Sequence, residues 1–110
     1  MNDVLCVVLS TAPDRETAER IGEALLRERL AACVQYEAVR SQYWWQGELC
    51  TDDEVRLTIK TRRALYDAVE AAIIRLHPYD CPQVLCLPVA AVNAGYAQWL
   101  AATLRCDNPQ

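Results

Sequence analysis

The feature that most constrains the fold is a pair of long extended stretches that meet at Gln46-Gly47. Residues 32–45 form the first arm and residues 48–61 form the second. In the second arm apolar and polar residues alternate, which is the period of a strand with one face toward a core. The apolar members of that alternation are Val55, Leu57 and Ile59. This segment is expected to form a long β-hairpin.

Regular elements are expected on both sides of the hairpin. Residues 4–10 are a continuous apolar run, typical of a central strand buried on both faces. After turn and capping residues at positions 11–14, apolar residues recur at helical spacing until about Leu30. A second helix is expected over about 62–76, with Thr61 as a plausible N-cap and Pro78 as its stop.

The C-terminal part of the chain adds a short buried strand over residues 83–89 and a third helix that opens at Asn93. The order strand, helix, hairpin, helix, strand is the split βαβ pattern. Handedness rules leave few ways to assemble it, so we expect an α+β, ferredoxin-like βαββαβ sandwich with an added C-terminal helix. Residues 1–110 are expected to form a single domain.

The hairpin is longer than the helix that is expected to pack over it. Each arm of about 14 residues spans roughly 46 Å, whereas the second helix covers about 22 Å. The far end carries Tyr43, Trp44 and Trp45 in succession, so a free monomer would expose apolar side chains beside unpaired strand edges. We expect these three residues to form a homo-oligomer interface; the alternative is that the C-terminal helix folds back over the tip.

Composition excludes several classes of function. The net charge of −4 and the pI of about 4.9 disfavour a nucleic-acid partner. The first apolar run is too short for a membrane span and lacks a preceding basic residue, so we expect no membrane association and a cytoplasmic location. The six cysteines contain no C-x-x-C pair and are expected to be reduced thiols.

Seven short stretches resemble, in order and spacing, the successive motifs of the CutA family of divalent-cation tolerance proteins. They are "VVLSTAPD" followed by "ETAERI", then "ERLAACV", "SQYWWQGEL", "EVRLTIKTRR", "HPYDCP" and "LPV…Y…WL", covering roughly residues 4–104.

The resemblance implies a ferredoxin-like subunit assembled through the long hairpin into a homotrimer similar to the PII signalling proteins. It also implies a link to tolerance of copper and other divalent ions, with possible copper or other divalent-cation binding and no established catalytic activity. Two positions depart from the family pattern. Ser10 stands where some members have cysteine, and Gln83 stands where the pattern has glutamate, and both are poorer ligands.

The stretch "HPYDCPQ" supplies the candidate metal ligands His77, Asp80 and Cys81. An imidazole, a carboxylate and a thiol suit copper, zinc or nickel, but a complete site needs three or four ligands, which facing subunits of a trimer could provide. The alternatives are that His77 caps the last carbonyls of the second helix, or that the cleft binds a non-metal ligand.

Three further residues, Lys60, Tyr79 and Trp45, are expected to line an inter-subunit ligand cleft. The cationic stretch 60–63 could also hold an anion together with the amides of the following helix. The acidic run 51–54 is expected to be a solvated edge, because alternate strand residues point to opposite faces.

Together with these residues, the resemblance implies a non-enzymatic homotrimer that binds metal ions or a small effector and contributes to metal tolerance. The competing functions are a PII-like anion-binding signalling or scaffold protein and an uncharacterised small-molecule enzyme. The enzyme hypothesis is weakened by a single histidine and only three glycines.

Overall fold

The computed structural model describes residues 4–106. Along the chain the elements are β1 (Leu5–Ala12), α1 (Arg15–Arg27), β2 (Cys33–Trp45), β3 (Glu48–Arg62), the 3₁₀ turn η1 (Arg63–Leu65), α2 (Tyr66–Leu76), β4 (Leu85–Pro88) and α3 (Ala94–Thr103). This order is the expected βαββαβ arrangement with one added helix. The fold class predicted from the sequence is confirmed.

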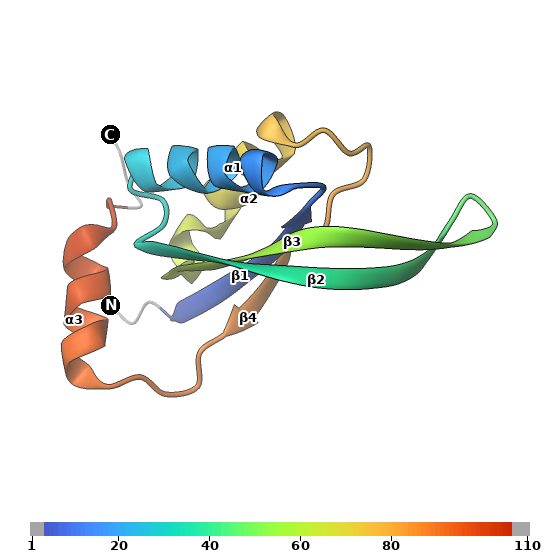
Figure 1. Cartoon of the computed structure of the whole chain (residues 1–110). Helices are drawn as coiled ribbons and strands as arrows, with labels where there is room; N and C mark the ends of the chain where they lie inside the picture. The colour runs from blue at the N-terminus through green and yellow to red at the C-terminus, as the bar shows by residue number, and fades with distance from the viewer. Residues whose placement is uncertain (1–3, 107–110) are drawn as a thin grey trace.

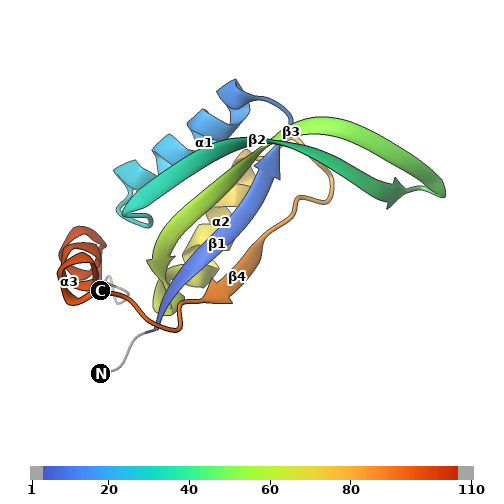
Figure 2. The same cartoon turned by 60° about the horizontal axis from the view of Figure 1, so that its bottom comes forward.

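The four strands form one antiparallel sheet in the order β2-β3-β1-β4. Helices α1 and α2 lie side by side over one face of it, and the β2–β3 hairpin extends well beyond them (Figures 1 and 2). The ladder between β2 and β3 runs without interruption from Cys33 opposite Lys60 to Trp45 opposite Glu48. The sheet is therefore a compact platform with one long projecting ribbon.

The core lies between this platform and the two helices. Alternate residues of the central strands point into it, including Val8 of β1 and Leu57 and Ile59 of β3, each fully buried. The apolar stripes of the helices meet them, with Ile21 and Leu25 from α1 and Val69 and Ile73 from α2. Asp14 caps α1 by accepting a hydrogen bond from the Thr17 amide at 2.8 Å, as expected from the capping residues at positions 11–14.

The other face of the sheet is left open by the described elements. Strand β1 is central, as expected, but in the chain taken alone it is not buried on both faces, because partly exposed residues alternate with buried ones over residues 5–10. The neighbouring residues Leu85 and Leu87 of β4 are 50% and 48% exposed. The sequence of β1 is apolar on a side that this chain does not cover.

The hairpin reverses at a two-residue turn. Gln46 and Gly47 both have positive φ, at 52° and 80°, which is what a two-residue turn matched to the twist of the strands requires. Glycine adopts this conformation at little cost. The turn closes directly on the Trp45–Glu48 pair, so all of residues 33–45 are paired.

Helix α3 lies at the end of the sheet away from the hairpin tip (Figure 1). Leu100 and Leu104 are buried there, and the Arg105 amide donates to the Arg29 carbonyl at 3.0 Å. The alternative in which this helix covers Tyr43, Trp44 and Trp45 is wrong. Those side chains are 39%, 72% and 43% exposed in the single chain.

Two expectations about the region around α2 are also wrong. Thr61 is not an N-cap, because β3 continues through it and its buried hydroxyl donates to the Leu30 carbonyl at 2.7 Å. The helix begins only at Tyr66, after the 3₁₀ turn, and Leu65 stands at its N-cap position without a side-chain bond. The last strand is shorter than residues 83–89, since only four residues pair with β1.

Candidate functional site

A groove of about 760 Å³ lies between the outer half of the hairpin and the loop that joins α2 to β4. Residues 41–45 and Glu54 line it from the hairpin, Thr11 from the end of β1, and Tyr79, Asp80, Cys81 and Gln83 from the loop. The groove thus forms where β1 stops at Ala12 and β3 continues without that neighbour. Two of the three residues expected in a ligand cleft, Tyr79 and Trp45, meet here.

Glu54 is the buried acidic group of the groove. It is only 8% exposed, and its Oε2 accepts a hydrogen bond from the Tyr79 hydroxyl at 2.7 Å. Burial and this bond to the carboxylate both raise the pKa of Tyr79, so the phenol stays neutral and remains a donor. The pair ties the loop to β3 across the mouth of the groove.

A second phenol–carboxylate pair lies nearer the tip, where the Tyr43 hydroxyl donates to Asp52. The hydrogen bond to that carboxylate raises the pKa of Tyr43 to about 12. Asp52 and Glu54 are two residues apart on β3 and therefore share a face of the ribbon. The two pairs stand in succession along the groove.

His77 occupies the C-cap position of α2, but its ring bonds elsewhere. Nε2 lies 2.6 Å from the Thr11 carbonyl oxygen, and Nδ1 accepts the Tyr79 amide proton at 3.2 Å. Because Nδ1 is the acceptor, Nε2 carries the proton and donates to Thr11. The imidazole therefore fastens the loop to the end of β1, and the alternative that it caps the last carbonyls of α2 is wrong.

The candidate ligands do not make a complete metal site within one chain. Over residues 4–106, no group of three or more His, Cys, Asp or Glu side chains is close enough together to hold an ion. Asp80 and Cys81 are exposed at the groove, whereas both nitrogens of His77 are occupied. Ser10 is fully buried in the helix-covered face, and its Oγ finds no hydrogen-bond partner among the described residues.

The cationic stretch 60–63 lies at the opposite end of the sheet, so Lys60 does not join Tyr79 and Trp45 within the chain. The Lys60 ammonium lies 5.6 Å from the centroid of the Tyr96 ring, on α3. The Arg63 guanidinium lies 5.3 Å from the Tyr66 ring, and Arg62 donates to the Arg105 carbonyl. Each of the three cations therefore already has a neighbour in the described chain.

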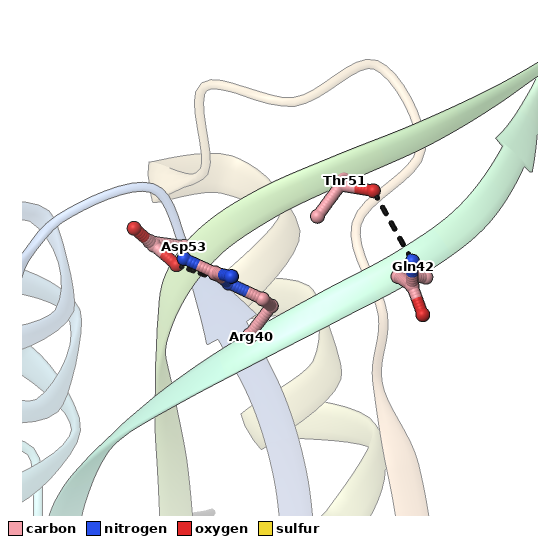
Figure 3. Close-up of polar contacts among 4 residues, drawn as sticks. All are labelled: Arg40, Gln42, Thr51 and Asp53. Atoms are coloured by element: carbon pink, nitrogen blue, oxygen red, sulfur yellow. Dashed lines mark hydrogen bonds and ion pairs between the residues drawn. The ribbon is translucent and has the colours of Figure 1, made fainter.

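The opposite face of the outer hairpin has a different character. Arg40 donates to Asp53 at 3.0 Å, and Gln42 donates to Thr51 at 3.4 Å, each pair directly across the two strands (Figure 3). Both pairs are exposed, and the Arg40–Asp53 pair carries one charge of each sign. The acidic run 51–54 is thus split, with Asp53 solvated as expected and Glu54 buried in the groove.

Sequence reasoning missed Glu54 because it used the alternation only to argue against a shared cation site and expected both faces of the run to be solvated. Its signal was present in the alternation, which places Glu54 and Asp52 on one face and Asp53 on the other. What the sequence did not show is that the loop after α2 covers only one of these faces. Tyr79, which does the covering, is 25 residues away along the chain.

The family model for CutA1 divalent ion tolerance proteins matches residues 6–103 of this chain. A divalent-cation tolerance protein CutA from Pyrococcus horikoshii is 41% identical over 96 residues, which are 87% of this chain and 94% of that protein. The CutA of Pectobacterium atrosepticum is 42% identical, covering 90% of this chain and 91% of the relative.

Solved structures agree with the sequence matches. The crystal structure of CutA1 from Pyrococcus horikoshii superposes with a TM-score of 0.89 at 38% identity, covering 92% of this chain and 99% of that one. A CutA from Archaeoglobus fulgidus, described as a periplasmic divalent cation tolerance protein, gives a TM-score of 0.90 at 30% identity, covering 92% of this chain and 99% of that one.

A rice relative, described as chloroplastic, is 40% identical over 90% of this chain, which is 56% of its own length. Relatives with different locations thus share this domain. In the described part of the chain, none of the helices is both long enough and apolar enough to cross a membrane.

Proposed function

This chain belongs to the CutA family of divalent-cation tolerance proteins, and from that membership we propose that it is a non-enzymatic homotrimer that binds metal ions or a small effector in clefts between subunits. Its contribution is to the cell's tolerance of divalent metal ions, copper among them. The family membership supports the link to metal tolerance. The open sheet face and the projecting hairpin support the proposed assembly into a homotrimer.

The open face supports assembly because its residues are apolar without being covered. Leu85 and Leu87 are half exposed beside β1, and Trp44 and Leu49 are 72% and 62% exposed at the tip. Exposed apolar side chains of this kind are typical of interfaces between subunits. Three copies, rather than two, is what the family resemblance implies, with Tyr43, Trp44 and Trp45 at the contacts between subunits and clefts left between them.

The groove supports the binding of a metal ion or an effector. Asp80 and Cys81 are exposed at its rim, and ligands from a second copy would complete a coordination shell that one chain does not hold. His77 joins that shell only by giving up its bond to Thr11 or to the Tyr79 amide. Lys60 would reach such a cleft only from a neighbouring subunit.

Sedimentation at micromolar concentration tests the assembly, and the expected result is a single species of three times the chain mass. Sedimentation as a monomer would overturn the proposed trimer.

Calorimetric titration of the reduced protein with Cu(I), Cu(II) and Zn(II) tests the ligands, with His77→Ala compared against Cys81→Ser. We expect the cysteine variant to lose affinity for Cu(I); equal affinities in parent and both variants would remove these residues from the site.

Anion binding at residues 60–63, as in a PII-like signalling protein, has less support. The cations there are already engaged with Tyr96, Tyr66 and a backbone carbonyl. The same titration extended to a nucleotide panel would decide this point.

A cytoplasmic location is likewise a proposal, since relatives are described as periplasmic and chloroplastic, and cell fractionation tests it.

A further inference from the structure

We propose that the groove between the outer hairpin and the 79–83 loop binds an alkylammonium cation, held against its aromatic side chains and beside its carboxylates. The proposal rests on effector binding in this groove and names the chemical class of the effector. It is argued from the lining of the groove, its size and the groups that are already satisfied within it.

The charges of the lining have one sign. Glu54 and Asp80 contribute carboxylates, and among residues 4–106 of the single chain no lysine, arginine or histidine lines the groove. Asp52 adds a further carboxylate through its contact with Tyr43, which does line it. Since the two phenols stay neutral, the groove has an excess of negative charge that favours a cation and repels an anion.

The walls are aromatic on both sides. Tyr43 and Trp45, which point to the same face of the ribbon as Glu54, come from the hairpin and Tyr79 from the loop, and each is at least 37% exposed in the single chain. A cation within about 6 Å of such a ring centroid is attracted by its negative face, most strongly when that cation is a weakly hydrated alkylammonium. Tyr79 is held in place by its bond to Glu54, so one ring is positioned before any ligand arrives.

The same arrangement suits an organic cation better than a small metal ion. A divalent ion strips its water only for several well-placed ligands, and the described residues bring no three acidic, thiol or imidazole groups together. One oxygen of Glu54 is already bonded to Tyr79, and Asp52 is already bonded to Tyr43. An alkylammonium needs no coordination shell, only nearby negative charge and apolar contact.

The size of the groove admits such a ligand. Its volume of about 760 Å³ lies within the roughly 300–1,000 Å³ of ordinary small-molecule sites. The polar residues Ser41 and Gln83 supply hydrogen-bonding groups at its edge for a hydroxyl or amide elsewhere on the ligand. The groove therefore fits a small amine that carries one charged head and a short polar tail.

The test is calorimetric titration of the assembled, reduced protein with (2-hydroxyethyl)trimethylammonium and with its uncharged carbon isostere, 3,3-dimethyl-1-butanol. The two probes have nearly the same shape, so the difference between them measures the charge. We expect the cation to bind at least about tenfold more tightly, and its affinity to fall as salt is raised.

Two substitutions distinguish binding in this groove from attraction to the overall negative charge of the protein. Glu54→Gln removes a charge from the groove while keeping a group that can accept from Tyr79, and we expect it to weaken binding about tenfold. Asp53→Asn removes the same charge from the adjacent residue, whose side chain faces Arg40 on the opposite side of the ribbon. We expect the control to bind like the parent protein.

If Glu54→Gln does not fold, Asp80→Asn at the exposed rim serves in its place, with an expected loss of about threefold. Equal binding of the two probes, or equal weakening by Asp53→Asn, would overturn the proposal. A trimer that binds Cu(I) or Zn(II) but not the alkylammonium would also overturn it and leave the proposed function standing. If the protein binds none of these probes, both the alkylammonium proposal and the proposed binding function are wrong.

Discussion

The inner and outer halves of the hairpin share one uninterrupted ladder but have opposite surroundings. In the inner half Leu57 and Ile59 are fully buried under α1 and α2, whereas in the outer half Trp44 and Leu49 are 72% and 62% exposed. Backbone pairing is the same in both. Pairing of the two strands therefore does not determine which side chains of the hairpin are buried. The helices determine it, because they cover only the inner half of the ribbon.

The outer half is held by its own cross-strand pairs and by one loop. Arg40–Asp53 and Gln42–Thr51 lie on one face, and the groove with Glu54 and Tyr79 lies on the other. Exposed cross-strand pairs contribute about 0.2–1 kcal/mol each, much less than a buried aliphatic side chain. The inner half thus contributes most of the folding stability of the hairpin, and the outer half leaves large apolar side chains exposed.

Leu57→Ala should produce the largest effect, because it leaves a cavity in the core between β3 and the helices. We expect the free energy of unfolding to fall by about 2–5 kcal/mol, measured by denaturant titration. The matched change in the outer half, Leu49→Ala, should leave the folding of a single chain nearly unchanged and weaken assembly. Similar losses of folding stability in both variants would break the contrast between the halves.

Tyr79→Phe should have the next largest effect, since it removes the donor to the buried Glu54 carboxylate. The expected loss of stability is about 1–3 kcal/mol, the cost of leaving a buried acceptor unsatisfied. In a background of Glu54→Leu the same change should cost much less, which a double-mutant cycle measures. Additive losses would mean that the bond does not fasten the loop.

Arg40→Ala should change the stability by no more than about 0.5 kcal/mol. Its ion pair with Asp53 is exposed at both ends, with side chains 72% and 79% accessible, and such pairs contribute little in water. The measurement is the same denaturant titration at low and high salt. A larger, salt-sensitive loss would show that the polar face of the ribbon is covered in the assembled protein.

The smallest effect should come from the titration of Tyr43. Its pKa is raised from 10.0 to about 12 by the bond to Asp52, so the protonated phenol is favoured in the folded protein. That contribution to stability is complete below pH 10.0 and is lost as the pH rises toward about 12. Phenolate absorbance should show this late step in the parent protein and lose it in Tyr43→Phe; titration of Tyr43 at its ordinary pKa would contradict the bond.

Much of the fold could be predicted from local pattern. The alternation in β3, the apolar stripes of the helices and the turn at Gln46-Gly47 each depend on residues within one element, and their types were predicted correctly. The errors came where distant parts compete for the same residue. Thr61 has the chemistry of an N-cap, but the Leu30 carbonyl, 31 residues away, takes its hydroxyl.

The site was predicted less completely for the same reason. The sequence selected Tyr79 and Trp45, which the groove brings together, but it also selected Lys60, which lies near α3. His77 was assigned either to a metal or to its own helix, and its ring instead contacts Thr11, 66 residues away. The metal assignment of His77, Asp80 and Cys81 stays a prediction.

By itself the sequence determined the order of strands and helices, the length of the hairpin and the apolar character of its tip, because periodicity and turn chemistry act over a few neighbouring residues. Only the tertiary structure decided which half of the hairpin is covered, which carboxylate of the acidic run is buried, and where His77 bonds. These depend on contacts across 25 to 66 residues of chain, formed when α2 packs on the sheet and its following loop crosses the end of β1.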